Sequence, residues 1–281
     1  MPLQVLRIFG RFLFVVNLAS LWVFVREGMK ASRDYLRLVW NAYLWRRSLL
    51  RLPSFKLNLP EVSLNAISAE AESALIKLQY AFYRPGSLPI EELAILAAIV
   101  RSLQPKRIVE IGTAEGRTTL NLALNSPPDA EVITFDLPRE LTGRHQKHSG
   151  PNYRQMGIDE PGVLFRNHLI ASKIKLVLAD SKKFDWTLYE RSVDFVFIDG
   201  AHDYGSVWED TKNALRIIRP GGIIVWHDYG VWEGVTRCLD ELREYFPVVL
   251  LKDTTLACLR VTEDDLQNFE EKCKGQGHRF A

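Results

Sequence analysis

The chain has 281 residues, of which 47% are hydrophobic and 25% charged, and its net charge at pH 7 is +2. A chain of this length and apolar content can bury the core of a full α/β domain with an appendage, which excludes an intrinsically disordered protein. Its three cysteines lack CxxC spacing, which argues against a disulfide framework or a zinc cluster and favours a reducing compartment. We therefore expect a cytoplasmic location.

Residues 1–51 are predicted to form a basic extension. They hold nine Lys and Arg side chains against two acidic ones, so the rest of the chain is net acidic. An acidic body argues against nucleic-acid binding, and the extension is the part suited to an anionic surface. The apolar run 12–25 is shorter than the roughly 20 residues of a spanning helix, and no convincing signal-peptide cleavage site follows it.

Within this extension, apolar residues from Leu36 to Leu44 recur at helical spacing, and most basic residues lie off the apolar stripe. The pattern predicts an amphipathic basic helix, and Trp22, Trp40 and Trp45 suit the depth of lipid headgroups. We expect a peripheral anchor on a membrane surface. Packing on the globular body or a dimer interface is an alternative of equal weight, a short signal anchor is a third option, and the oligomeric state stays open.

Residues 52–86 are predicted to contain a linker and an accessory helix, Ser68–Tyr80, which begins with a serine cap. The globular body is expected to span residues 87–265 and to begin with a strongly apolar helix, Ile90–Leu103. A C-terminal tail, residues 266–281, follows the body.

Strands and helices alternate through the body. Predicted strands cover residues 108–111, 131–135, 174–178, 194–198 and 222–226, and predicted helices cover 162–171, 204–218 and 233–245. Such alternation is typical of a parallel sheet covered on both faces. The last two predicted strands, 246–251 and 256–260, are joined by a short KDTT connection, which favours a hairpin. We predict an α/β fold: a Rossmann-like, doubly wound, mostly parallel seven-stranded sheet with an antiparallel last strand, plus an N-terminal helical extension.

The segment RIVEIGTAEGRTT, residues 107–119, joins a buried strand to a helix through a glycine turn. Gly112 and Gly116 allow a tight turn and a close approach of the backbone to a ligand. Ala114 stands where a dinucleotide-binding fold carries its second glycine, which disfavours a pyrophosphate and favours a nucleoside without phosphates. A plain tight connection between strand and helix is the alternative.

Polar side chains follow successive predicted strands. In chain order they are Glu110, Asp136, Asp180 with Ser181, Asp199 with His202, and His227 with Asp228. Ligands of open α/β sheets bind at the edge formed by the carboxyl ends of the strands. A single acid after a strand is commonly a helix cap, but five such positions in succession predict a binding site.

The motifs ExGxxxG, FDLP, the DS pair, FIDGAHxY and GGxIxWHDY, taken in this order, resemble class I S-adenosylmethionine-dependent methyltransferases. More narrowly, they are similar to small-molecule O-methyltransferases of the catechol and macrolide-sugar types. The resemblance spans about residues 87–261. It implies S-adenosylmethionine as cofactor and transfer of its methyl group to an oxygen of a small molecule or saccharide.

The same resemblance implies cofactor-binding roles for six residues. Gly112 and Gly116 meet the methionine part, with Glu110 near its ammonium group. Asp136 accepts hydrogen bonds from the ribose hydroxyls, and Asp180 with Ser181 reads the adenine edge. A cationic sulfonium is consistent with this acidic rim.

Asp199, His227 and Asp228 are expected to hold a divalent cation, which would bind two substrate oxygens and lower the pKa of the attacking hydroxyl. Related metal-using enzymes generally place an acid where His227 stands. Because an imidazole shifts preference from magnesium toward manganese, iron or zinc, the ion's identity is open. The alternative is that His227 is hydrogen-bonded beside the site without binding an ion.

His202, three residues after Asp199, is the expected general base because its unperturbed pKa lies near neutrality. Together with Asp199 it forms the expected catalytic pair, although a histidine that only holds the turn is the simpler alternative. Two other functions compete with methyl transfer. One is a membrane-attached nucleoside-binding or scaffold protein without catalysis, and the other is a hydroxylase-like relative of the same fold that requires 2-oxoglutarate and iron.

Overall fold

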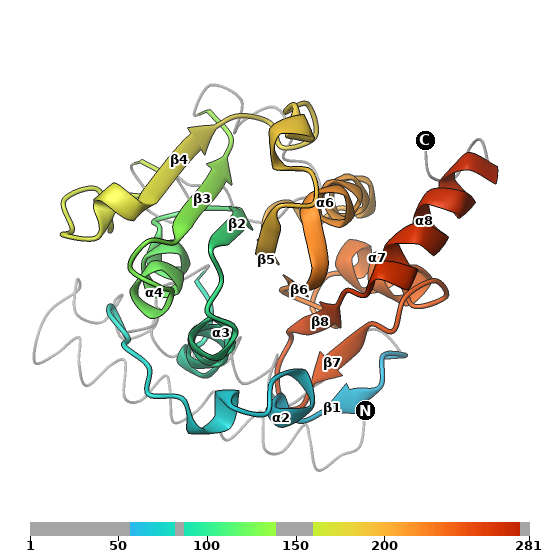
Figure 1. Cartoon of the computed structure of the whole chain (residues 1–281), viewed down its shortest axis with the longest axis horizontal. Coiled ribbons are helices and arrows are strands. Elements are labelled where there is room, and N and C mark those ends of the chain that lie inside the picture. The colour runs from blue at the N-terminus through green and yellow to red at the C-terminus, as the bar shows by residue number, and fades with distance from the viewer. Residues whose placement is uncertain (1–56, 82–86, 139–159, 276–281) are drawn as a thin grey trace, which may run out of the picture. The chain divides into compact units, whose positions relative to one another are not determined.

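The computed structural model describes residues 57–81, 87–138 and 160–275 (Figure 1). The chain divides into two units, Met1–Leu52 and Pro53–Ala281. The predicted basic extension, residues 1–51, lies outside the described residues. Within the described ranges, every helix is too short or too polar to cross a bilayer.

The body is built on an eight-stranded sheet in the order β1-β7-β8-β6-β5-β2-β3-β4. The strands are β1 (Glu61–Val62), β2 (Arg107–Ile111), β3 (Glu131–Asp136), β4 (Ile174–Leu178), β5 (Val193–Ile198), β6 (Ile218–Trp226), β7 (Val249–Leu251) and β8 (Ala257–Arg260). β8 runs antiparallel to both of its neighbours, and all other pairs are parallel. The predicted mostly parallel sheet with an antiparallel last strand is confirmed, with β1 as an additional strand inside the predicted linker.

Helices cover both faces of this sheet (Figure 1). The helical elements are α2 (Leu64–Ile67), α3 (Ile90–Leu103), α4 (Arg117–Asn125), α6 (Tyr204–Ile217), α7 (Glu233–Leu242) and α8 (Glu263–Gly275), with short 3₁₀ turns η1 (Ala71–Ser73), η2 (Ala171–Lys173) and η3 (Trp186–Tyr189). α3 and α4 share one apolar core with Ile108, whereas α6 and α7 share the other core with Val109. Adjacent residues of β2 thus face opposite layers, as the period of a strand requires.

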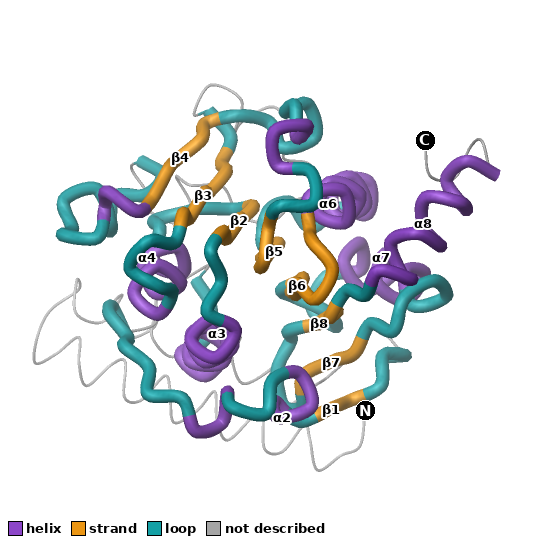
Figure 2. Tube along the Cα trace, in the orientation of Figure 1, coloured by secondary structure: helices purple, strands orange, loops and turns teal. Residues whose placement is uncertain are grey.

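Two predicted helices are wrong, as the tube in Figure 2 shows. Residues 162–171 form a series of turns that ends in η2. Gly162 has a φ of +74°, and its N–H donates to the carbonyl of Ala114 (2.8 Å), while the N–H of Leu164 donates to the carbonyl of Glu115 (3.0 Å). Because these two N–H groups bond to the glycine turn after β2, they are not available for the hydrogen bonds of a continuous helix.

The predicted helix Ser68–Tyr80 is also replaced, here by η1 and an extended strap that runs along α4. The Asn125 side chain accepts from the N–H of Lys77 and donates to its carbonyl (both 2.8 Å). Asn121 does the same at Gln79, at 2.8 and 3.0 Å. Each amide therefore satisfies both backbone groups of one residue, which lets an extended segment lie against a helix.

The predicted tail from residue 266 continues α8 as far as Gly275. Leu266 is buried in the core of the α6 and α7 face, and Phe269 packs against Phe246 with ring centroids 5.5 Å apart. At least this part of the C-terminal segment belongs to the globular unit.

The chain reverses its direction of travel across the sheet between β2 and β5. From β2 it continues outward to β3 and β4, and it then returns to β5 and β6 on the other side of β2. Ligands of open α/β sheets bind at such a switch point, outside the carboxyl ends of the strands. The fold therefore predicts a site above the ends of β2 and β5.

Candidate active site

The expected site residues lie at the carboxyl ends of five neighbouring strands. Going along the edge from β6 to β4, they are His227 and Asp228 after β6, Asp199 and His202 after β5, Glu110 and Gly112 at β2, Asp136 at β3, and Asp180 with Ser181 after β4. Backbone hydrogen bonds keep the ends in register, since Asp199 donates to Ile111 and His227 donates to Ile198. One edge of the sheet thus carries all the expected polar groups.

The two glycines of the turn after β2 are required by the protein's own packing. Gly112 has a φ of +102°, and a Cβ there would lie 2.0 Å from the carbonyl oxygen of Asp199. A Cβ on Gly116, whose φ is +85°, would lie 2.5 Å from the ring of Phe165. Any side chain at Gly112 would push β2 away from β5 at the switch point.

Glu110 is fully buried on the α3 and α4 side of β2. Its Oε2 accepts from the hydroxyls of Thr119 and, at 2.6 Å, Thr134, while Oε1 has no partner among the described residues. Burial raises the pKa of this carboxyl to about 8, against the opposing effect of the two threonine hydroxyls. A buried acceptor without a partner costs free energy unless a ligand satisfies it.

Asp136 fastens the glycine turn to the end of β3. Its Oδ2 accepts from the N–H groups of Thr113 (3.0 Å) and Ala114 (2.9 Å), and its Oδ1 accepts from the N–H of Leu137 (2.7 Å). A ribose hydroxyl would share this carboxylate with three backbone donors. Asp136 therefore holds the glycine turn in place, and it lies at the position where the ribose contact was expected.

Asp180 and Ser181 cap the turn after β4. Asp180 Oδ1 accepts from the N–H of Lys182 at 3.1 Å. The Ser181 hydroxyl donates to Asp210 at 2.6 Å, and burial raises the pKa of Asp210 to about 7. With its hydrogen engaged, Ser181 Oγ keeps its lone pairs, and these suit an amino group such as that of adenine.

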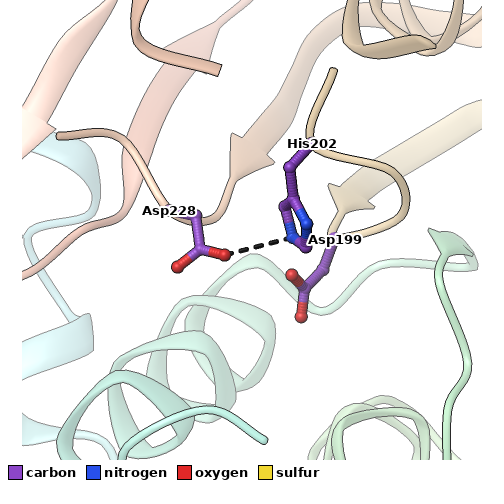
Figure 3. A group of neighbouring side chains, drawn as sticks. All are labelled: Asp199, His202 and Asp228. Carbon is purple, nitrogen blue, oxygen red and sulfur yellow. Dashed lines mark ion pairs between the residues drawn. The ribbon is translucent and has the colours of Figure 1, made fainter. Parts of the chain in front are cut away.

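Asp199, His202 and Asp228 converge at the switch point (Figure 3). One potential ligand atom from each lies within 4.8 Å of the others. His202 Nε2 is 3.1 Å from Asp228 Oδ2, and the His202 ring stacks on Trp232 with centroids 5.1 Å apart. Asp228 adopts a φ of +67°, an uncommon conformation for a residue with a side chain, so its backbone is held under strain beside the site.

His227 lies beside this group, and both of its ring nitrogens face carboxylates. Nδ1 is 2.9 Å from Asp199 Oδ1, and Nε2 is 3.0 Å from Glu92 Oε2. The expected cation set of Asp199, His227 and Asp228 thus differs from the observed group, in which His202 takes the third place. His227 Nδ1 also lies 3.5 Å from Asp228 Oδ1, so this ring is surrounded by three carboxylates.

The charges of the site determine its ionisation. Burial disfavours the charged form of His227, but the carboxylates of Asp228 and Asp199 and the contact with Glu92 raise its pKa well above the ordinary value. Burial likewise opposes a charged His202, yet its hydrogen bond to Asp228 and the nearby charges raise its pKa. For Asp228, burial is outweighed by the two histidines and Trp232, which lower its pKa to about 2. Asp228 therefore stays ionised at neutral pH.

Glu92 is a site residue that the sequence analysis missed. It lies in the first turn of α3 and is 3% exposed, inside an otherwise apolar helix. A usable signal was present, because a helix that precedes the first strand of a parallel unit starts at the carboxyl edge of the sheet. Two aromatic residues next to the site, Trp226 and Tyr229, are core residues: Trp226 donates to Thr211, and Tyr229 donates to Asp240.

A family model described as "Methyltransferase domain" matches residues 109–229, a range that includes all the strand-end residues from Glu110 to Asp228. The chain contains a methyltransferase domain. The match begins within β2 and ends just after β6, so it covers the switch point and the edge described above.

Relatives of this methyltransferase domain carry O-methyltransferase or synthase names. A Mycobacterium sp. (strain JLS) protein with an O-methyltransferase name is 31% identical over 134 residues, 48% of this chain and 53% of its own. Tricin synthase 2 of Oryza sativa subsp. japonica is 27% identical over 155 residues, 55% of this chain and 48% of its own. Caffeoyl-CoA O-methyltransferase of Populus kitakamiensis is 25% identical over 183 residues, which are 64% of this chain and 71% of its own. The chain thus spans about half the length of the first two relatives.

The solved structure of the O-methyltransferase NovP has a similar fold. It aligns with a TM-score of 0.51 at 17% identity and covers 71% of this chain and 98% of NovP. The likeness supports the Rossmann-like architecture of the methyltransferase domain.

Proposed function

We propose that the protein transfers the methyl group of S-adenosylmethionine to an oxygen of a small molecule or saccharide, with the help of a divalent cation. The observation that carries this proposal is the convergence of Asp199, His202 and Asp228 within 4.8 Å beside the glycine turn of a methyltransferase domain. The competing scaffold and hydroxylase-like functions are favoured by no observation.

The residues present fit the cofactor. Glu110 Oε1 is a buried acceptor that lacks a partner among the described residues, and the ammonium group of the methionine part is a donor that would satisfy it. Asp136 and Ser181 follow along the same edge, so the ribose would lie at Asp136 and the adenine would lie at Ser181. The ionised carboxylate of Asp228 suits a cationic sulfonium, which becomes neutral when it loses its methyl group.

The donor set also fits a divalent cation. Asp199 and Asp228 would hold it, because magnesium and manganese favour carboxylate oxygens and one or two carboxylates are a common protein contribution. When bound, such an ion lowers the pKa of a coordinated hydroxyl and fixes the position of its oxygen. The two carboxylates suit either magnesium or manganese.

His202 is proposed as the general base. Its contact with Asp228 and its stacking on Trp232 fix the orientation of the ring beside the group. The acceptor hydroxyl gives its proton to the imidazole while its oxygen attacks the methyl carbon. The carbon–oxygen bond forms as the carbon–sulfur bond breaks, and S-adenosylhomocysteine leaves.

Calorimetric titration with S-adenosylhomocysteine tests the cofactor assignment. We expect saturable binding with a stoichiometry of one, in the micromolar range or tighter, because the buried acceptor and the acidic edge are already in place before the ligand arrives. ATP, which shares the adenosine but adds a triphosphate, is the matched control and should bind much more weakly to the acidic edge. A folded sample that binds neither compound would refute the proposed function.

The N-terminal extension, residues 1–51, is proposed to attach the protein to anionic membrane surfaces. The support is its charge pattern, nine basic against two acidic residues. Deleting residues 1–51 should abolish cosedimentation with vesicles that contain phosphatidylserine and leave S-adenosylhomocysteine binding unchanged. Equal sedimentation of both forms would contradict the anchor, and loss of a dimer without loss of vesicle binding would assign the extension to self-association.

A further inference from the structure

Glu92 is a buried carboxylate whose two oxygens are committed to different parts of the fold. Oε1 accepts from the N–H (2.6 Å) and the hydroxyl (2.9 Å) of Thr255, in the turn between β7 and β8. Oε2 lies 3.0 Å from His227 Nε2. An acid that only complements the helix dipole would stay at the surface, as its exposed neighbour Glu91 does. Stabilisation of the helix dipole therefore does not explain why Glu92 is buried.

His227 passes this contact on to Asp199. Its two ring nitrogens lie on opposite sides of the ring, so the ring joins Glu92 of α3 to the carboxylate that follows β5. The side chain of His227 is 12% exposed and that of Glu92 is 5% exposed, so little water competes for these contacts. The chain of contacts Thr255–Glu92–His227–Asp199 links the turn between β7 and β8, helix α3 and the switch point.

The contact occupies one oxygen of Asp199 and leaves the other for a ligand. Because His227 contacts Oδ1, it restrains the rotation of the carboxylate, and we assign Oδ2 to a ligand shared with His202 and Asp228. Hydrogen bonds from neighbouring residues orient the ligands of metal sites in this way, and removing such a partner typically weakens metal binding about 10-fold to 100-fold.

On the basis of the proposed function, we propose that Glu92 and His227 are a positioning pair that aims the Asp199 carboxylate at a divalent cation. Neither residue contacts the ion. Glu92 holds the His227 ring in place, and the ring holds Asp199. The pair explains why a histidine, which was expected to bind the ion, occupies a position where related metal-using enzymes generally place an acid.

The test compares Glu92→Ala, Glu92→Gln and the matched control Glu91→Ala, which removes an exposed acid from the same helical turn. The probe is Mn²⁺ alone, with the free ion measured by electron paramagnetic resonance, and S-adenosylhomocysteine affinity is measured on the same samples. We expect Glu92→Ala to weaken Mn²⁺ binding about 10-fold to 100-fold. Glu91→Ala should bind Mn²⁺ as the wild type does, and all variants should bind S-adenosylhomocysteine within about threefold of it.

Glu92→Gln separates positioning from a general loss of stability. The glutamine oxygen can accept from Thr255 and its amide can donate to His227 Nε2, which leaves Nδ1–H to hold Asp199. Mn²⁺ affinity should therefore recover to within about threefold of the wild type. If Glu92→Ala does not fold, Glu92→Met, which has similar volume but no oxygen acceptor, takes its place with the same expected loss.

The outcomes distinguish this proposal from the function on which it rests. Wild-type Mn²⁺ affinity in a folded Glu92→Ala or Glu92→Met variant would overturn the positioning pair and leave the proposed function intact. A wild-type protein that binds S-adenosylhomocysteine but no Mn²⁺ would overturn the pair together with the cation, while the cofactor assignment would stand. Failure to bind S-adenosylhomocysteine would refute the proposed function itself.

Discussion

Replacing either Asp199 or Asp228 with alanine is expected to lower the rate of methyl transfer about 10³-fold or more, while S-adenosylhomocysteine affinity stays within about threefold of the wild type. The two carboxylates belong to the group that converges at the switch point, and each change removes one ligand of the proposed ion. Such an ion contributes several kcal/mol of charge stabilisation in the transition state, and about 1.4 kcal/mol corresponds to a tenfold change in rate. The measurement is transfer of tritiated methyl to an acceptor found by screening compounds with neighbouring hydroxyls.

Asp203→Asn is the matched control for this experiment. Asp203 lies in the same loop, but it caps α6 by accepting from the N–H of Ser206 at 3.1 Å, a bond that an asparagine oxygen can replace. Its activity should stay within a few-fold of the wild type. Full activity of both alanine variants after chelation of divalent ions would exclude the cation from the reaction.

His202→Gln separates the two roles that the geometry allows this histidine. A general base can be removed without a change in Mn²⁺ affinity, whereas removal of a ligand weakens it. We expect a loss of turnover of about 10²-fold or more with unchanged Mn²⁺ binding. A parallel loss of both would move His202 from the proton-transfer role to the coordination sphere.

The second large effect concerns Glu110 and pH. Its pKa in the free protein is about 8, raised mainly by burial, so the carboxyl is mostly protonated at pH 7. An ammonium group at Oε1 favours the ionised form, so binding of S-adenosylhomocysteine should release a proton. Affinity should rise as the pH increases from about 6 to about 8, approaching tenfold per unit, and then level off, because above pH 8 the carboxyl is already ionised before binding.

Calorimetry in two buffers of different ionisation enthalpy measures the released proton directly. Glu110→Gln should remove both the proton release and the pH dependence and should weaken binding about 10-fold to 100-fold, because a hydrogen bond to a charged group contributes about 1.5–3 kcal/mol. Binding by the wild type that is independent of pH between 6 and 8, without proton release, would show that Glu110 does not meet the ammonium group.

The sequence was sufficient to predict the parts of the fold whose signal is local. β2, α3 and β4 lie where they were predicted because strands and apolar helices differ in length and period. The edge that gathers Asp136, Asp180 and Asp199 followed from topology, because every parallel strand ends on the same side.

The missed features depend on partners that are distant in the chain. Residues 68–80 have a helical composition, yet asparagines of α4 take up the backbone groups of the strap. Glu92 and His227 are 135 positions apart, and nothing near either residue indicates their contact. The ring nitrogens of His227 could not be assigned from sequence, because the neighbours of a histidine decide whether it binds an ion or holds a ligand.

The hold of Asn121 and Asn125 on the strap acts through main-chain atoms of Lys77 and Gln79. These hydrogen bonds do not depend on which side chains the strap carries. Substitutions at positions 77 and 79 should therefore leave the path of the strap unchanged, whereas a change at either asparagine would release it. A search for the same arrangement in other proteins should look for a pair of asparagines one helical turn apart instead of for similarity within the strap.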